Sequence, residues 1–307
     1  DETSMVDVSL MSLLLRALPS SSALLLIGDV DQLPSVGPGQ VLSDILQSGA
    51  IPVARLVEVF RQEGESAIIL NAHRVNRGEM PDLNQQRSAE TEDFYFVEAE
   101  TPEDAAEKVV RMVSRRIPKR FGLDPVRDIQ VLCPMNRGAL GTQALNQALQ
   151  ATLNPSSGFA RVERFGTVYR LGDKIMQTSN DYEKDVFNGD LGSIESIDHE
   201  AQDIVLRFED RSINYRFGEL DNVALAYAMT IHKSQGSEYP AVVIPVSTQH
   251  YVMLKRNLLY TAITRARRLV VLVGQPRALG IAIQSGERDR RWTRLLELLA
   301  SPEALQS

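Results

Sequence analysis

The chain of 307 residues is 43% hydrophobic, contains one cysteine and carries a formal net charge of −7. This length predicts about two domains, and the longest apolar runs, 23–27 and 269–273, are far shorter than the ~20 residues of a membrane-spanning helix. The single cysteine, Cys133, excludes an internal disulfide and suits a reducing cytoplasm. Four scattered histidines argue against a zinc site. The negative net charge argues against a protein that coats nucleic acid by bulk attraction.

The first fifty residues predict half of an α/β unit. An amphipathic helix is expected over Val8–Leu18 and a strand over Ala23–Ile27. The glycines and prolines of the following GDVDQLPSVGPG can extend neither element, so they predict a loop at the carboxyl end of that strand. In open α/β sheets, ligands bind at this end.

Helices and strands alternate from residue 51 onward, with one interruption. The alternation in 51–160 and 222–307 predicts an α/β domain with a parallel sheet. Residues 161–221 contain short strands with turn signals and no helix, which predicts a small inserted β-barrel. The expected elements are the helices 66–77, 102–116 and 140–153, the strands FYFVEA, DIQVLCP, AVVIPV and LVVLVG, and a helix in RNLLYTAITRARR.

Local basic clusters would have to supply any attraction for nucleic acid. Two occur, at 111–120 and at 255–268. A solvated helix face explains the first of them more simply than a binding site does.

An acidic pair and a polar loop predict a phosphate site in the first segment. Asp1 and Glu2 precede, by the spacing of one helix and one strand, the loop that contains Gly28, Asp29 and Gln32. A nucleotide motor lines its γ-phosphate pocket with an acidic pair that binds Mg²⁺ and orients water, and with a strand that ends in Gly-Asp-x-x-Gln. Alone, a terminal acidic pair would carry no such meaning.

Two arginines could complete such a pocket. Arg61 follows Phe60 in VFRQ, and in YTAITRARR the spacing of Thr261, Thr264, Arg265 and Arg268 predicts one helix face. A guanidinium group there can neutralise charge on a transferring phosphoryl group. The alternatives are a surface ion pair for the first arginine and a helix end that satisfies carbonyls for the second.

Five motifs together carry a resemblance to a known family. DETSM, GDVDQLP, VFRQ, TIHKSQGSEY and YTAITRAR occur in the order and approximate spacing of motifs II to VI in the RecD-like branch of superfamily 1 helicases, which the whole chain resembles. The resemblance implies that residues 1–50 are the latter part of a first RecA-like domain. It implies a second RecA-like domain in 51–160 and 222–307, interrupted by an SH3-like barrel in 161–221.

The family travels 5′ to 3′ on DNA, with ATP in the cleft between the RecA-like domains and single-stranded DNA across both. The resemblance therefore implies a DNA helicase of recombination and repair, either free-standing or a subunit of a recombination exonuclease complex. An RNA helicase of the same superfamily, or a non-catalytic nucleic-acid-binding scaffold with a motor fold, stays an alternative.

The resemblance also assigns roles around the nucleotide. Asp1 is expected to hold Mg²⁺, Glu2 to act as general base, and Gln32 to link the γ-phosphate to the DNA side. Arg61 and Arg265 are the expected pair that reaches the γ-phosphate from the second domain. Further positions near ATP are Gly28, Asp29, Gly236 and Glu238.

The DNA-facing assignments follow from the same motifs and from chemistry. Thr230 and His232 lie where this family meets the strand, and Arg137 lies in the linking segment LCPMNRGALG. Tyr182 and Phe187 could stack on bases. Packing in the barrel core or in a hairpin is the more ordinary role for these two aromatics.

One expected motif is missing. A phosphate-binding loop needs Gly-Lys-Ser or Gly-Lys-Thr, and the chain contains no Gly-Lys dipeptide. We therefore expect the chain to be part of a longer protein that supplies this loop, and we expect it not to hydrolyse ATP by itself.

Overall fold

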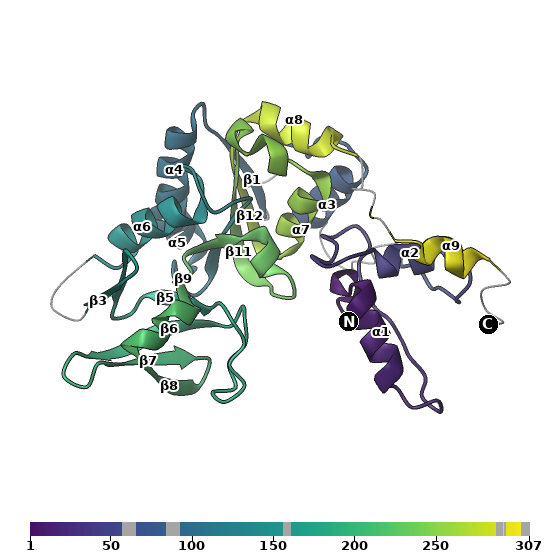
Figure 1. Ribbon diagram of the computed structural model, residues 1–307. Helices are drawn as coiled ribbons and strands as arrows, with labels where there is room; N and C mark the ends of the chain where they lie inside the picture. The colour runs from purple at the N-terminus through teal and green to yellow at the C-terminus, as the bar shows by residue number, and fades with distance from the viewer. Residues whose placement is uncertain (57–65, 84–92, 156–160, 287–290, 292, 302–307) are drawn as a thin grey trace.

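The computed structural model describes residues 1–56, 66–83, 93–155, 161–286, 291 and 293–301. Its centre is a parallel sheet in the order β1-β12-β11-β2-β10 (Figure 1). The sheet confirms the predicted α/β class. Its strands come from the parts of the chain before residue 161 and after residue 221. The strands are β1 (Phe94–Glu98), β2 (Ile129–Cys133), β10 (Ala228–Thr230), β11 (Tyr239–Val246) and β12 (Ala266–Gly274).

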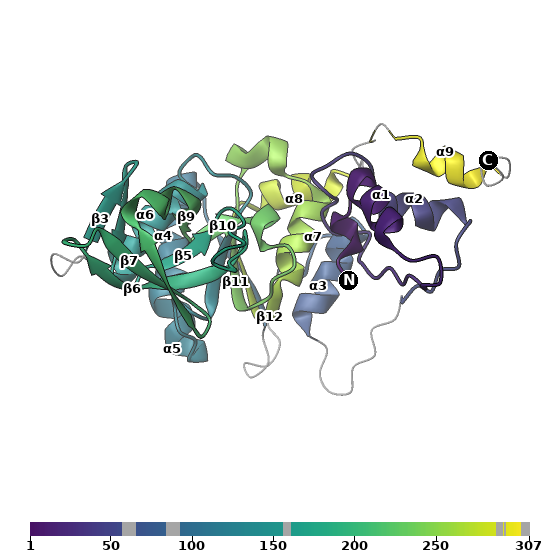
Figure 2. The same ribbon diagram turned by 60° about the horizontal axis from the view of Figure 1, so that its bottom comes forward.

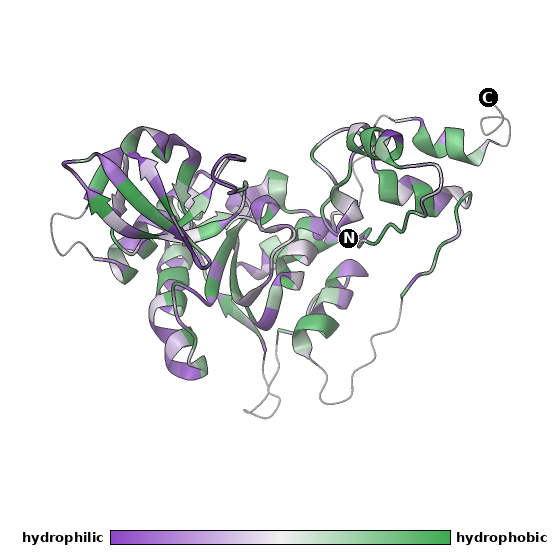
Figure 3. Cartoon of the chain, turned by 90° about the horizontal axis from the view of Figure 1, so that it is seen from below, coloured by the Kyte–Doolittle hydropathy of each residue, from purple (hydrophilic) through white to green (hydrophobic). Residues whose placement is uncertain are grey.

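Helices cover both faces of this sheet because its strands are apolar on both sides, as is usual for parallel sheets. Along β12, Val271 packs into one core, and its neighbours Val270 and Leu272 pack into the other. Figure 3 shows these strands as a hydrophobic band within the molecule. The first core is covered by α4 (Pro102–Arg111) and α6 (Thr142–Leu153), and the second by α3 (Ala67–Asn76), α7 (Arg256–Thr264) and α8 (Pro276–Gln284).

The helix that carries the first basic cluster is longer than predicted. Thr101 caps its start by accepting a hydrogen bond from the Asp104 amide at 3.1 Å. After α4 the chain continues through a π-helical turn, Met112–Arg116, into α5 (Ile117–Phe121), which ends at Gly122 with φ 67°. The cluster's cations are exposed along this helix, as expected for a solvated face: Arg111, Arg115, Arg116, Lys119 and Arg120.

Residues 161–225 form an antiparallel sheet in the order β8-β7-β6-β5-β9, with the separate hairpin β3-β4 beside it. The short strands were predicted, but among the described residues no ladder joins β8 to β9, so the expected barrel is an open sheet here. The strands are β3 (Arg161–Arg164), β4 (Thr167–Arg170), β5 (Lys174–Gln177), β6 (Leu191–Asp198), β7 (Asp203–Phe208), β8 (Arg211–Arg216) and β9 (Val223–Leu225).

A buried carboxylate connects this inserted sheet to the central domain. Asp173 is fully buried and accepts hydrogen bonds from Gln150 at 2.6 Å, Asn154 at 2.7 Å, the Arg170 amide at 2.7 Å and the Tyr227 hydroxyl at 2.9 Å. The donors come from α6 and its end, from β4 and from the segment between β9 and β10. Because each donor would be costly to leave unpaired, the network fixes the junction.

The first segment lies on the side of the central sheet opposite the inserted sheet (Figure 2). It contains a 3-10 turn (Thr3–Met5), α1 (Val8–Ala17) and α2 (Val41–Ser48), and α9 (Leu295–Ala300) packs against α2. The strand expected over Ala23–Ile27 is wrong, because a strand needs hydrogen-bonded neighbours and no ladder in the described chain pairs with it. No helix in the described ranges is long and apolar enough to span a membrane.

Candidate nucleotide site

Arg265 lies at the carboxyl end of α7, where the helix changes directly into a strand. The helix ends at Thr264, the Arg265 amide closes its last turn, and β12 begins at Ala266. Arg268 therefore lies on the strand, exposed, and the prediction that it shares a helix face with Arg265 is wrong. The Arg265 residue itself is only 4% exposed.

The Arg265 guanidinium group brings together four of the five motifs, although these motifs lie far apart in the sequence. Its Nη2 donates to Oε1 of Gln32 at 2.9 Å, and its Nη1 lies 3.6 Å from Oε1 of Glu2. Nη1 also donates to the Ser237 carbonyl at 3.3 Å, whereas the buried Nε has no partner in the described part of the chain. The predicted grouping of Glu2, Gln32 and Arg265 is present.

A hydrogen-bonded chain orients Gln32. Its Nε2 donates to Oδ2 of Asp29 at 3.3 Å, and the Tyr260 hydroxyl donates to the same oxygen at 2.8 Å. Burial, with the charge of Asp29 adding to it, raises the pKa of Tyr260 well above its usual value. The hydroxyl therefore stays a donor, and the carboxamide oxygen of Gln32 faces Arg265.

The loop that carries Gln32 is held by hydrogen bonds to residues that come later in the chain. The Leu33 amide donates to Oγ1 of Thr261 at 2.8 Å, and Nε2 of Gln235 donates to the Leu33 carbonyl at 3.0 Å. Asn76, at the end of α3, donates to Oδ2 of Asp31 at 2.9 Å. Sequence reasoning missed Tyr260, Gln235 and Asn76; the first two lie inside the quoted motifs, which is the signal that could have found them.

The acidic pair is placed by a close contact with Gly28. Glu2 has a φ of 55° and begins the turn Thr3–Met5, while the Thr3 amide donates to the Ile27 carbonyl at 2.9 Å. A Cβ atom at Gly28 would lie only 2.9 Å from the Thr3 nitrogen. Glycine at this position therefore lets the Asp1-Glu2 turn approach the Gln32 loop.

The chemistry of these groups fits a Mg²⁺-bound phosphate. Asp1 is exposed and offers carboxylate oxygen, the donor type that Mg²⁺ prefers. No cluster of three or more acidic, His or Cys residues in the described ranges could hold a metal ion alone. Mg²⁺ is commonly held by one or two carboxylates plus substrate phosphates, and the buried Nε of Arg265 is a donor that has no partner among the described residues.

The other candidates lie outside this cluster. Gly236, with φ 77°, follows the 3-10 turn Ile231–Ser234, and Glu238 is exposed and pairs with Arg267 at 2.7 Å. Thr230 ends β10, His232 lies exposed on the next turn, and Arg137 is exposed after β2. Arg61 lies outside the described residues.

Tyr182 and Phe187 lie near each other on the surface of the inserted sheet. They are 79% and 39% exposed, and their rings meet edge to face with centroids 6.0 Å apart. The bridge between Asp181 and Val186 closes the hairpin that carries them. Packing in the barrel core is therefore wrong for both, whereas packing within the hairpin is confirmed.

Three family models match successive parts of the chain. Residues 1–93 match an AAA domain, 145–208 match the ATP-dependent RecD-like DNA helicase SH3 domain, and 225–273 match the UvrD-like helicase C-terminal domain. The chain is also 38% identical over 297 residues to the ATP-dependent RecD2 DNA helicase of Deinococcus radiodurans, which covers 97% of this chain. The chain belongs to the RecD-like helicase family.

Another RecD-like relative is the RecBCD enzyme subunit RecD of Mycolicibacterium smegmatis, 31% identical over 291 residues and 92% of this chain. The chain spans 39% of the Deinococcus relative and 51% of the Mycolicibacterium one. A crystal structure of Pif1 helicase from Bacteroides, in complex with ADP-AlF3 and ssDNA, superposes with a TM-score of 0.53 at 18% identity, covering 96% of this chain and 71% of the other. This likeness shows that the RecD-like chain shares a RecA-like helicase fold.

Proposed function

We propose that this chain supplies the γ-phosphate sensors and the second motor domain of a longer protein, an ATP-dependent 5′-to-3′ DNA helicase of the RecD type. The observation that carries the proposal is the meeting of Glu2, Gln32 and Arg265 around one buried guanidinium group. The three residues come from different motifs, and they have the chemistry that phosphoryl transfer needs. Their grouping favours a motor over a non-catalytic scaffold.

Each residue has a distinct chemical task in this proposal. Glu2 accepts the proton of the attacking water, and the Arg265 guanidinium neutralises the charge that develops on the transferring phosphoryl group. Gln32, which is hydrogen-bonded to Asp29, contacts the γ-phosphate when ATP is bound. Loss of this phosphate would shift the Gln32 loop, whose Leu33 amide donates to Thr261. Arg61 is proposed as the second arginine. We also propose the domain division stated above: 1–50, 51–160 with 222–307, and 161–221.

ATP and Mg²⁺ are proposed as ligands of the longer protein. Asp1 would hold the ion, and Gly28, Asp29, Gly236 and Glu238 are proposed as further positions near ATP. When bound, Mg²⁺ would withdraw charge from the phosphate oxygens. The phosphate-binding loop would come from the remainder of the protein.

Single-stranded DNA is the proposed track. Thr230, His232 and Arg137 can contact phosphates without reading sequence, and the exposed pair of Tyr182 and Phe187 offers rings on which bases could stack. Partner subunits of a recombination complex are a further proposal, supported by the likeness to the RecD subunit of Mycolicibacterium smegmatis.

Unwinding assays with the full-length protein test this function. We expect ATP-dependent unwinding of a DNA duplex with a 5′ single-stranded tail, no unwinding of the same duplex with a 3′ tail, and no activity in Glu2→Gln. Preference for an RNA duplex would support the RNA helicase alternative instead. ATP turnover that is unchanged by Glu2→Gln would contradict the catalytic assignment.

A further inference from the structure

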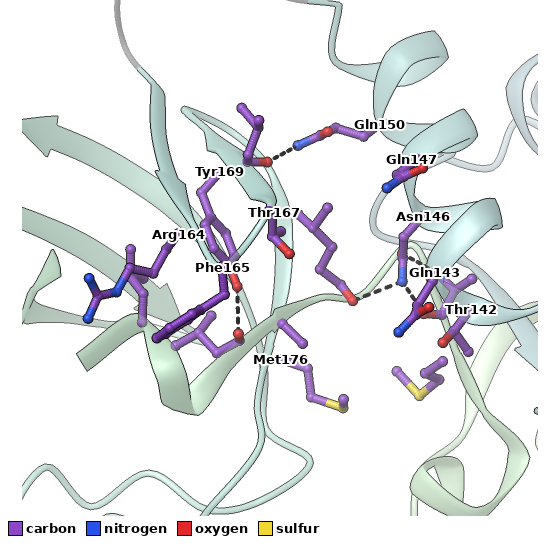
Figure 4. Close-up of a pocket in the computed structure, with 18 of the residues that line it drawn as sticks. Thr142, Gln143, Asn146, Gln147, Gln150, Arg164, Phe165, Thr167, Tyr169 and Met176 are labelled. Atoms are coloured by element: carbon purple, nitrogen blue, oxygen red, sulfur yellow. Dashed lines mark hydrogen bonds between the residues drawn. The ribbon is translucent and has the colours of Figure 1, made fainter. Parts of the chain in front are cut away.

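The groove beside the inserted sheet does not join the first segment to the rest of the chain. It has a volume of about 820 Å³, and Figure 4 shows the β3-β4 hairpin, with Phe165, on one side of it and α6 side chains on the other. All of its lining residues lie between Asn136 and Lys233. The contacts that hold the first segment therefore lie elsewhere, and the site around Arg265 supplies some of them.

A segment near the end of the chain packs back onto the first segment. It consists of Arg291 and residues 293–301, which we call the return segment, and it follows α8, a helix that packs against α7 in the central domain. Its helix α9 packs against α2 of the first segment, as Figure 1 shows at the right of the molecule. The Thr293 hydroxyl donates to Oδ2 of Asp44, on α2, at 3.3 Å. The return segment thus connects the two parts of the chain a second time.

Arg291 donates to the main chain of the loop 35–39, which lies just beyond Gln32. Its Nη1 donates to the Gly37 carbonyl at 2.6 Å and to the Gly39 carbonyl at 3.4 Å. The hydroxyl of the buried Ser35 donates to the same two carbonyls, at 3.3 Å and 3.4 Å. Arg291 makes no ion pair with a described residue. Its printed role is therefore that of a charged donor to this loop.

The loop 35–39 is packed tightly between α1 and the return segment. A Cβ atom at Gly37 would lie 1.8 Å from Oδ2 of Asp7, the residue that caps α1. A Cβ atom at Gly39 would lie 2.5 Å from the Val8 side chain and 3.0 Å from that of Thr293. A shift of the return segment would therefore reach the loop directly.

The central domain fixes the point where the chain leaves it toward the return segment. The Arg256 amide, at the start of α7, donates to Oγ of Ser285 at 3.0 Å, and its Nε donates to the Ile283 carbonyl at 2.7 Å. Four residues separate Gly286 from Arg291, and five residue steps span at most about 18 Å. Arg291 is therefore linked to the central domain by a short stretch of chain.

We propose that Arg291 is a positioning residue for ATP hydrolysis, which holds the loop 35–39 and thereby keeps Gln32 opposite Arg265. The inference rests on the proposed helicase function and deepens it, because it gives the return segment a role in the nucleotide site. Thr261 anchors the chain directly after Gln32, and Arg291 anchors it a few residues later. A loop that is anchored at more points has less conformational entropy to lose when its side chain contacts phosphate.

Steady-state ATP hydrolysis by the full-length protein, with single-stranded DNA present, tests this role. Arg291→Ala removes a charged donor, so Gln32 should be in place for a smaller fraction of the time. We expect kcat to fall roughly 10-fold, the size of effect that the loss of one hydrogen bond from a charged group gives. KM should stay within about threefold, because the lost contact acts in the transition state. Arg291→Lys keeps a charged donor and should retain kcat within about threefold.

Arg294→Ala is the matched control, because Arg294 belongs to the return segment but pairs with Glu297 of α9 itself, at 2.9 Å. Its kcat should equal that of the unmodified protein. Hydrogen exchange of the nucleotide-free protein gives a second readout that does not depend on activity. The backbone amides of residues 33–39 should exchange faster in Arg291→Ala than in Arg294→Ala.

Each other outcome has a defined meaning. A kcat for Arg291→Ala equal to that of the unmodified protein would overturn the positioning role and leave the helicase proposal standing. Equal losses in Arg291→Ala and Arg291→Lys, or a loss of nucleotide affinity as large as the loss of kcat, would show general damage to the fold and would also overturn it. Absence of ATP turnover in the unmodified full-length protein would overturn the proposed function itself.

Discussion

Arg265 donates a hydrogen bond to Gln32 at 2.9 Å, although the two residues lie 233 positions apart in the chain. Arg265 lies at the end of α7, and Gln32 lies in the loop that follows the apolar run 23–27. The bond joins the segment that carries the acidic pair to the domain that carries the arginine. A change at the proposed phosphate site would therefore reach both parts of the chain through this hydrogen bond.

Tyr260 should act as a positioning residue for this contact. Tyr260→Phe removes the 2.8 Å hydrogen bond to Asp29, and a hydrogen bond to a charged group contributes about 1.5–3 kcal/mol. In the full-length protein we expect the kcat for ATP to fall roughly 10-fold, with a smaller change in KM. Tyr251→Phe, which removes an exposed hydroxyl, is the control. A kcat equal to that of the unmodified protein would show that Tyr260 does not orient Gln32 during turnover.

Asp173 should be essential for the junction between the inserted sheet and the central domain. Asp173→Ala leaves buried donors from Gln150 and Tyr227 without an acceptor, so we expect the free energy of unfolding to fall by roughly 2–5 kcal/mol. Urea denaturation measures this loss. Asp210→Ala, at an exposed turn, should change it by less than about 0.5 kcal/mol. Similar midpoints for the two variants would show that the network does not stabilise the junction.

Lys174 should make stability depend on pH in the alkaline range. It is 6% exposed and donates to the Ile129 carbonyl at 3.2 Å; burial lowers its pKa from 10.5 to about 8, partly opposed by Asp124 and Asp128. Between these pH values the unfolded chain binds more protons than the native chain, so stability rises with pH, by up to about 3 kcal/mol in total. Below pH 8 both states are protonated, and this group contributes no slope.

Urea denaturation at pH 8 and at pH 10 measures the effect. The gain in stability of the unmodified protein relative to Lys174→Met is the quantity to compare, because tyrosines titrate in the same range in both proteins. An identical pH dependence in the two proteins would contradict the lowered pKa.

The alternation of helices and strands predicted the central sheet because a parallel sheet buried on both faces needs continuous apolar strands. The position where α7 ends could not be predicted in the same way, because TRARR suits either a helix end or a strand start. The pairing of β12 with β1 and β11 decides where the helix changes into a strand. The strand expected over Ala23–Ile27 failed for a related reason: apolar character does not supply a neighbouring strand.

At the site, motif order predicted the meeting of Glu2, Gln32 and Arg265. Membership of a motif marks Tyr260 as a candidate, but it does not show that the Tyr260 hydroxyl donates to Asp29 and so orients Gln32. Phe165, which lines the groove in Figure 4, was overlooked for a local reason: RFGT suits an ordinary turn, and only the φ and the exposure of Phe165 show that its ring is held outward.

The most direct test of the central claim is ATP turnover and nucleotide binding by Arg265→Ala in the full-length protein. An arginine that stabilises the transferring phosphoryl group contributes roughly 10³- to 10⁵-fold in rate. We predict a loss of that order in ATP turnover measured by phosphate release, with nucleotide affinity retained in a binding titration. Turnover equal to that of the unmodified protein would contradict the assignment of Arg265 and, with it, the account of the site.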